Sequence, residues 1–166
     1  MHLQLDLVGG ISGDMFIGAM LDSFPHLAAA LPQQLVLAGF RNLVQLEHQP
    51  FNDGILTGTR FKVSPALTAE DHGHRHHSEI RQILLDSQLS DAVRQASLDI
   101  FQLLAVAEAK IHGKAVADIA FHEIGAWDSI ADVVCAAYLI VATGIRSCSV
   151  STLPLGRGQV HTAHGN

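Results

Sequence analysis

The chain has 166 residues, of which 48% are hydrophobic and 16% are charged, and its formal net charge is −6 at pH 7. This length suits one domain with a continuous core, and the hydrophobic content excludes a chain that is disordered throughout. The ten Lys and Arg residues form no basic run of the density that a nucleic-acid surface needs. We therefore expect a single domain over residues 1–166 that does not bind nucleic acid.

The chain also lacks the features of a secreted or membrane protein. No Lys or Arg precedes Arg41, so the amino end has no basic region of a secretory signal. The longest uncharged apolar run, residues 133–142, is far too short to span a bilayer. Cys135 and Cys148 form no CxxC pair and are expected to be reduced and packed. These observations predict a cytoplasmic protein without a membrane partner.

The first part of the chain predicts a strand, a glycine-rich turn and two helices. Leucines alternate with polar residues over residues 3–7, which is the period of a half-buried strand. A glycine-rich turn follows, and helical spacing then runs over residues 15–24 until Pro25 ends it. A second, short helix is predicted over residues 32–39.

A hairpin is predicted next. Apolar and polar residues alternate over residues 44–48 and again over residues 55–63, with Asn52-Asp53-Gly54 between them. Glu47 on the first arm and Lys62 on the second give the two polar faces opposite charges, which favours cross-strand pairing.

The second half predicts further helices joined by short strands. Helical spacing over residues 80–111 has a break near Ser90 and a stop at Gly113. A short strand is expected over residues 119–122, an apolar helix from Ser129 to about residue 142, and a last strand over residues 148–153. The expected fold is therefore α+β, a mixed sheet containing a central hairpin and flanked by helices.

The sharpest chemical signal is a histidine tract in a predicted loop over residues 68–78. It reads His72-Gly73-His74-Arg75-His76-His77 and so holds four imidazoles within six residues. Neutral imidazole binds Ni²⁺, Zn²⁺ and Cu²⁺, and a glycine-containing segment can fold several rings around one ion. The alternative is a hydrated loop without a metal. The close spacing of the four rings favours the first alternative, with metal contacts at His72, His74, His76 and His77.

The glycine-rich turn is a second candidate site. It consists of Gly9, Gly10, Ser12 and Gly13 and leads into a helix amino terminus, where free backbone donors favour an anion such as phosphate. The turn has no P-loop lysine, so a plain tight turn with Ser12 or Asp14 as helix cap is the alternative. Asp6 lies near the end of the first strand, where a metal-binding or general-base role and a solvated strand face are both open.

A third group lies between residues 122 and 132. His122, Glu123, Asp128 and Asp132 are four ligands or acid-base groups within eleven residues. Asp128 can cap the helix expected from Ser129. Asp132 lies one turn further in an otherwise apolar segment, where an unpaired buried carboxylate would be costly.

Two further imidazoles, His161 and His164, follow a glycine turn near the end of the sequence. Rings three residues apart can share an ion on a helix or turn, and terminal fraying is the alternative.

Four segments of the chain together resemble the nickel insertion proteins of lactate racemase maturation, the LarC family. In order they are Asp6-Leu7-Val8-Gly9-Gly10-Ile11-Ser12-Gly13-Asp14-Met15, the histidine tract, Phe121-His122-Glu123-Ile124-Gly125-Ala126-Trp127-Asp128-Ser129-Ile130, and residues 153–165 from Leu153-Pro154-Leu155-Gly156-Arg157-Gly158 to His164-Gly165. The resemblance implies a nickel chelatase of the lyase (cyclometallase) class. Its substrates would be Ni²⁺ and pyridinium-3,5-bisthiocarboxylic acid mononucleotide, its product the nickel-pincer nucleotide cofactor, and CTP with Mg²⁺ or Mn²⁺ would be consumed.

The resemblance also implies a longer protein, so we expect this chain to be the amino-terminal portion, with the carboxyl-terminal half of the family, which would bind CTP, as its partner. A homo-oligomer stays open. The four tract histidines are expected to gather nickel, with His161 and His164 as further metal ligands. The expected inner site comprises Asp6, Asp14, His122, Glu123, Asp128 and Asp132. Two alternatives are a nickel storage or chaperone module without catalysis and a nucleotide-binding, metal-dependent hydrolase.

Overall fold

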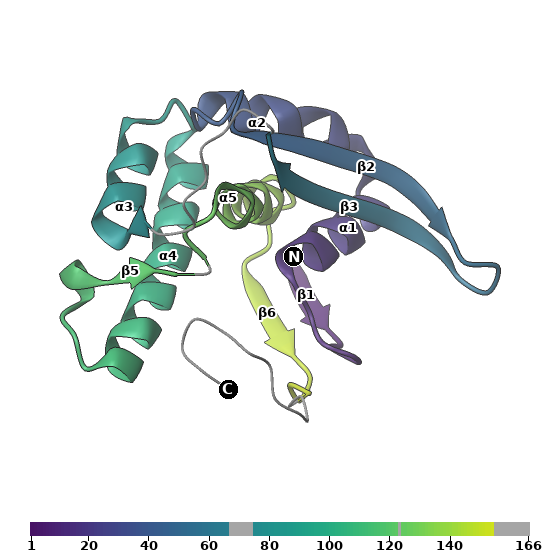
Figure 1. The fold of residues 1–166 in the computed structure, drawn as a ribbon. Coiled ribbons are helices and arrows are strands. Elements are labelled where there is room, and N and C mark those ends of the chain that lie inside the picture. Colours follow the sequence, from purple (N-terminus) through teal and green to yellow (C-terminus); the bar gives the residue numbers. More distant parts are fainter. Residues whose placement is uncertain (67–74, 123, 155–166) are drawn as a thin grey trace.

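The computed structural model describes residues 1–66, 75–122 and 124–154 and shows a mixed α and β fold (Figure 1). The helices and strands, in chain order, are β1 (His2–Leu5), α1 (Gly13–Ser23), a 3-10 helix (Pro25–Ala30), α2 (Leu31–Leu37), β2 (Val44–Asn52), β3 (Thr57–Pro65), β4 (Arg75–His76), α3 (His77–Asp86), α4 (Asp91–His112), a short 3-10 helix (Val116–Asp118), β5 (Ala120–Phe121), α5 (Trp127–Ala142) and β6 (Ser147–Val150).

Helix α5 lies at the centre of the fold. It is seen end-on in the middle of Figure 1, with α4 on one side, α1 and β3 on the other, and α2 above it. Its segment is apolar nearly all round, and Ile130, Val134, Cys135 and Leu139 are completely buried. A helix that is hydrophobic on every face must be covered by its neighbours. The core of the protein is therefore built around α5.

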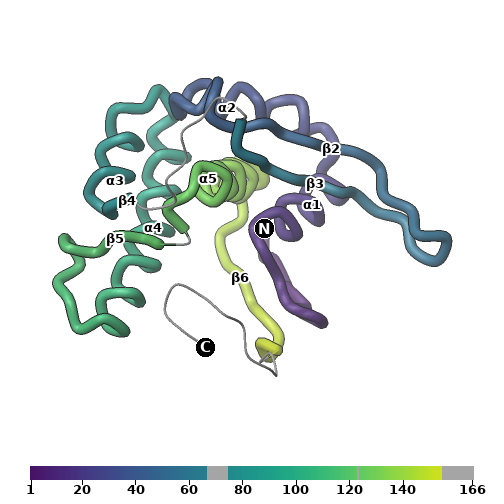
Figure 2. Tube along the Cα trace, viewed as in Figure 1, coloured from purple at the N-terminus to yellow at the C-terminus, as the bar shows by residue number. Residues whose placement is uncertain are grey.

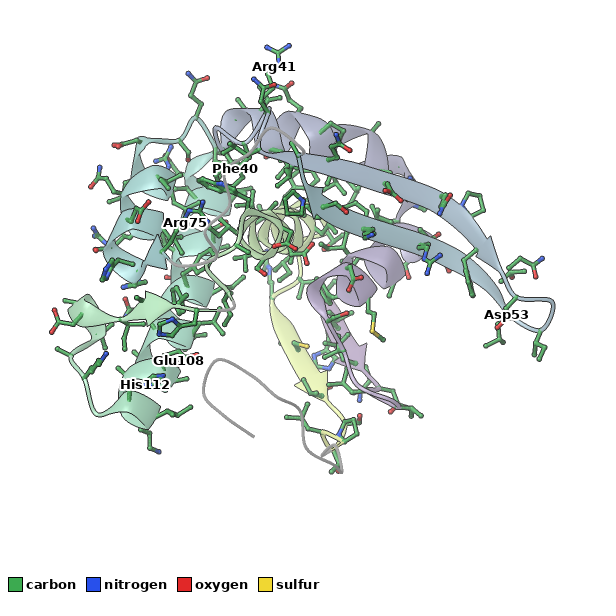
Figure 3. All side chains as sticks on the ribbon, viewed as in Figure 1. Phe40, Arg41, Asp53, Arg75, Glu108 and His112 are labelled. Atoms are coloured by element: carbon green, nitrogen blue, oxygen red, sulfur yellow. The ribbon has the colours of Figure 1, made fainter. Side chains whose placement is uncertain are left out.

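The predicted α+β class and the central hairpin are both confirmed. Strands β2 and β3 pair antiparallel in a register that puts Glu47 opposite Lys62. In the turn, Asp53 Oδ1 accepts hydrogen bonds from the backbone N–H groups of Ile55 (2.9 Å) and Leu56 (2.7 Å). The hairpin projects from the body of the protein and ends near Asp53 (Figure 3).

The strands of the described ranges do not join into one sheet. They form three separate pairs, namely β1 with β6, β2 with β3, and β4 with β5. The β1–β6 pair is parallel and joins the first strand to the last, which lie side by side in Figure 2. Pairing between strands far apart in sequence depends on how the helices between them pack, so alternation within each strand could not reveal it.

Several boundaries differ from the sequence expectation. The apolar helix begins at Trp127 rather than Ser129, so Asp128 lies in its first turn and Ala126 occupies the cap position. The expectation that both cysteines are packed was wrong for Cys148, which is exposed on β6, whereas Cys135 is buried in α5. The predicted loop over residues 68–78 ends early, because Arg75–His76 form β4 and α3 begins at His77. Among the described helices, none is long and apolar enough to cross a membrane.

Candidate functional site

The glycine turn brings Asp14 to the start of α1. Gly9 and Gly10 have φ angles of 90° and 101°, which side chains other than glycine rarely adopt, and they turn the chain from β1 toward the helix. Asp14 Oδ1 accepts a hydrogen bond from the backbone N–H of Met15 (2.9 Å) and another from the Ser12 hydroxyl. Ser12 occupies the cap position without a side-chain cap bond, so its hydroxyl orients the Asp14 carboxylate instead.

Helix α1 meets α5 at a glycine. A Cβ built on Gly13 would lie 2.6 Å from Asp132 Oδ2 and 2.9 Å from both Cβ and Cγ of Asp132. Real Cβ atoms do not approach other atoms so closely. The absence of a side chain at Gly13 therefore allows the Asp132 carboxylate to lie against the first turn of α1.

Three carboxylates interact at this junction. Asp128 lies in the first turn of α5, where its Oδ1 accepts a 2.8 Å hydrogen bond from the Ser129 backbone N–H, and Asp132 follows one turn later. Burial, and then the negative charges of Asp14 and Asp128, together raise the pKa of Asp132 from 3.8 to about 7. Asp132 Oδ1 is buried without a hydrogen-bond partner. We call Asp14, Asp128 and Asp132 the carboxylate cluster.

Asp6 directly follows β1, which ends at Leu5. It is exposed and lines a hollow of about 300 Å³ between β1, the glycine turn and α1, together with Leu3, Leu5, Phe16 and other apolar residues. The apolar lining suits the ring or chain of an organic ligand better than a metal ion.

The end of the histidine tract is attached to the fold. His76 is exposed on β4, while His77 is buried at the start of α3, with its ring centre 6.2 Å from that of Phe121. Burial, and then the nearby positive charge of Arg81, lower the pKa of His77. His77 is thus a packed imidazole whose lowered pKa favours its neutral form. His72 and His74 lie outside the described residues.

Arg75 connects the tract to the segment that leads into α5. It pairs with Phe121 in the β4–β5 register, and its Nη1 donates a hydrogen bond to the Gly125 carbonyl. Its guanidinium carbon is 3.7 Å from the centre of the Trp127 ring, which also packs against Phe40. Arg75 is buried beside α5 (Figure 3). Sequence reasoning missed this residue, although it is the one cation within the tract.

His122 is placed beside α4. Its ring centre lies 6.4 Å from that of His112, and His112 Nε2 lies 3.2 Å from Glu108 Oε2 one helical turn earlier. Figure 3 shows Glu108 and His112 on the part of α4 nearest to β5. Neither residue was a candidate from the sequence. Glu123, His161 and His164 lie outside the described residues.

The carboxylate cluster is not a closed metal site. Within residues 1–66, 75–122 and 124–154, no three His, Cys, Asp or Glu side chains form a group that could hold a metal ion. The carboxylates of Asp14 and Asp128 and the unpartnered oxygen of Asp132 nevertheless attract cations. Carboxyl groups with shifted pKa values are concentrated at functional sites.

A half-buried carboxylate cluster, in a chain that also carries a histidine tract, is typical of proteins that handle cations. Residues 3–166 match the model of the nickel insertion protein family, and the chain belongs to that family. It is similar to the pyridinium-3,5-bisthiocarboxylic acid mononucleotide nickel insertion proteins of Geobacillus kaustophilus (36% identity; 98% of this chain, 41% of the relative) and Desulfitobacterium hafniense (38% identity; 97% and 39%). The chain thus spans about two-fifths of the length of these relatives. No solved structure matches it.

Proposed function

We propose that this chain is the part of a nickel insertion protein that receives Ni²⁺ and presents it to pyridinium-3,5-bisthiocarboxylic acid mononucleotide. The substrate is that of the two relatives, and the product would be the nickel-pincer nucleotide cofactor. The observation that carries the proposal is the crowding of Asp14 and Asp128 around Asp132, with one Asp132 oxygen buried and unpartnered. Carboxylates placed in this way repel one another until a cation or a proton lies among them.

The chemistry of the ligands suits transfer better than storage. Carboxylate oxygens are hard donors that hold Ni²⁺ less firmly than imidazole or sulfur does. Because the cluster is not a closed metal site, we propose that the substrate's sulfur atoms complete the coordination of the ion. The ion would then pass from oxygen to sulfur without a tightly bound intermediate on the protein.

The histidine tract would collect the ion. Its last residues are tied to the segment that precedes Asp128 through the contacts of Arg75 with Gly125 and Trp127. An ion bound by His72, His74 and His76 would therefore be held on a segment anchored next to α5. His161 and His164, Glu123 and His122 stay candidates for additional ligands, and Asp6 with the glycine turn (Gly9, Gly10, Ser12 and Gly13) stays a candidate for contacts with the organic substrate.

We also propose the reaction class, the location and the CTP requirement that the family resemblance implies. The reaction would be of the lyase (cyclometallase) type and take place in the cytoplasm. CTP, with Mg²⁺ or Mn²⁺, would be bound by the part of the family proteins that this chain does not span, which would act as its partner. A homo-oligomer is compatible with the proposal.

The test uses a fusion in which residues 1–166 replace the matching segment of the Geobacillus kaustophilus relative. Nickel incorporation into the mononucleotide is followed by mass spectrometry. We expect Asp128→Asn and Asp132→Asn each to slow incorporation at least tenfold. Asp99→Asn on the exposed face of α4 is the matched control and should react at the unchanged rate. Full activity of both cluster variants would remove the cluster from the mechanism.

A further inference from the structure

We propose that the hollow between the first turn of α1 and the β2–β3 hairpin binds a phosphorylated aromatic cation through Phe51, Arg60 and Asp14. The hollow has a volume of about 310 Å³ and is lined by Asp14, Met15, Phe51, Thr59, Arg60 and Phe61. It shares Asp14 with the carboxylate cluster. The inference rests on the proposed function, since it assigns the substrate's binding residues beside that cluster.

The walls of the hollow are held firmly. Helix α1 approaches β3 closely at Gly18, where a Cβ would lie 3.0 Å from the Thr59 carbonyl oxygen. The Thr59 hydroxyl donates a 2.9 Å hydrogen bond to Asp22 Oδ1, and Phe61 is buried between strand and helix. These contacts fix the helix against the hairpin, so the hollow exists before a ligand arrives.

The charges of the hollow come from opposite sides. Asp14 contributes a carboxylate from α1, oriented by Ser12 and the Met15 backbone, whereas Arg60 lines the hollow from β3. The Arg60 guanidinium carbon lies 5.9 Å from the centre of the Phe51 ring, which is itself 41% exposed. The lining thus combines a negative group, a positive group and an accessible aromatic face.

These three features indicate the chemical class of the ligand. An aromatic cation stacks on the face of an aromatic ring and is attracted to a carboxylate. Arg is well suited to a phosphate, because its planar donors form paired hydrogen bonds with phosphate oxygens. A pyridinium mononucleotide carries both groups, and the volume lies at the lower end of the range for small-molecule sites, roughly 300 to 1,000 Å³. Bound here, its ring would lie beside Asp14.

The experiment uses nicotinic acid mononucleotide, a metal-free pyridinium mononucleotide, titrated into the chain by calorimetry. We expect Arg60→Gln to weaken binding at least tenfold and Phe51→Ala to weaken it several-fold. Lys62→Gln removes the same charge from the same strand outside the hollow, and it should leave the affinity within twofold. Nicotinic acid riboside, which lacks the phosphate, should bind the parent chain and Arg60→Gln equally.

Three results would overturn the inference: no binding of the mononucleotide to the parent chain, an unchanged affinity of Arg60→Gln, or an equal loss in Lys62→Gln. Because the titration contains no nickel, it is independent of the insertion assay. If the mononucleotide binds as expected but the cluster variants insert nickel normally, the proposed function fails and the binding site stands. If the cluster variants insert nickel slowly but the mononucleotide does not bind as expected, the proposed function stands and the binding site fails.

Discussion

The guanidinium carbon of Arg75 lies 3.7 Å from the centre of the Trp127 ring. Arg75 also donates a hydrogen bond to the Gly125 carbonyl, so it joins β4, at the end of the histidine tract, to the loop that begins α5. A buried arginine is stable only where its charge and its donors are satisfied. The stacking and the hydrogen bond contribute to that, and they hold β4 against the loop that precedes Asp128.

Replacement of Arg75 by Met should lower the free energy of unfolding by about 2 to 3 kcal/mol, because the cation–π contact and a charged hydrogen bond to a buried carbonyl are lost. Urea denaturation measures the change. Arg81→Met, on the exposed side of α3, is the control and should stay within about 0.5 kcal/mol of the parent. A cycle with Trp127→Leu should give a coupling energy of about 1 to 2 kcal/mol. A coupling near zero would show that the two side chains act independently.

Replacement of Gly13 by Ala tests the contact between α1 and the carboxylate cluster. The added Cβ would overlap Asp132, whose Cβ is backbone-attached and cannot move away easily, so we expect a loss of about 1 to 3 kcal/mol in unfolding free energy. Gly58→Ala is the matched control, because a Cβ there meets no atom within 4 Å. If Gly13→Ala had the same free energy of unfolding as Gly58→Ala, the two helices would not be in contact at Gly13.

The pH dependence of stability should change in Asp132→Asn. The folded protein holds a proton on Asp132 up to a pKa of about 7, whereas the unfolded chain releases it near 3.8. The stability from this proton is therefore fully present below about pH 4 and is lost as the pH rises through 7. The asparagine variant should gain about 1 to 3 kcal/mol relative to the parent at pH 8, after allowance for solvent screening of a half-buried group.

Denaturation midpoints measured between pH 4 and pH 8 give this comparison. Asp99→Asn, on an exposed part of α4, should follow the parent at every pH. Between pH 5 and pH 8, the free energy of unfolding of the parent should fall relative to that of Asp132→Asn. If it does not fall, the pKa of Asp132 is not raised.

The histidine tract should account for most nickel binding by the chain. We expect the triple variant His72→Ala, His74→Ala and His76→Ala to bind Ni²⁺ at least tenfold more weakly in calorimetry. Replacement of the exposed His26 and His48 serves as the control and should not alter the affinity. His77 needs a separate variant, because it is buried against Phe121 and its replacement also affects packing. Unchanged nickel affinity of the triple variant would rule out the tract as the collecting segment.

Local patterns were sufficient for most of the secondary structure. The stop at Pro25 and the break near Ser90 correspond to the ends of described helices, because each signal acts within a few residues of itself. The hairpin was equally accessible, since alternation and the Asn52-Asp53-Gly54 turn lie in one continuous stretch.

The candidate site was only partly accessible from the sequence. Asp132 was conspicuous as a lone carboxylate in an apolar helix, and the structure places Asp14 and Asp128 around it. Arg75, Phe51 and Arg60 gave no signal, because their roles depend on which distant residue each one contacts. The error at Cys148 has the same origin, as alternation in a short strand does not show which face will be covered.

The sequence by itself therefore determined the α+β class, the elements, and the residue types that made nickel handling the expectation. Only the tertiary structure decided that Gly13 admits Asp132 between two helices, that Arg75 stacks on Trp127, and that a hairpin forms one wall of a hollow beside Asp14. The physical reason is that helices and turns arise from interactions between near neighbours in the chain. Burial, carboxylate crowding and aromatic stacking arise instead between residues that are distant in the sequence and meet when the core packs around α5.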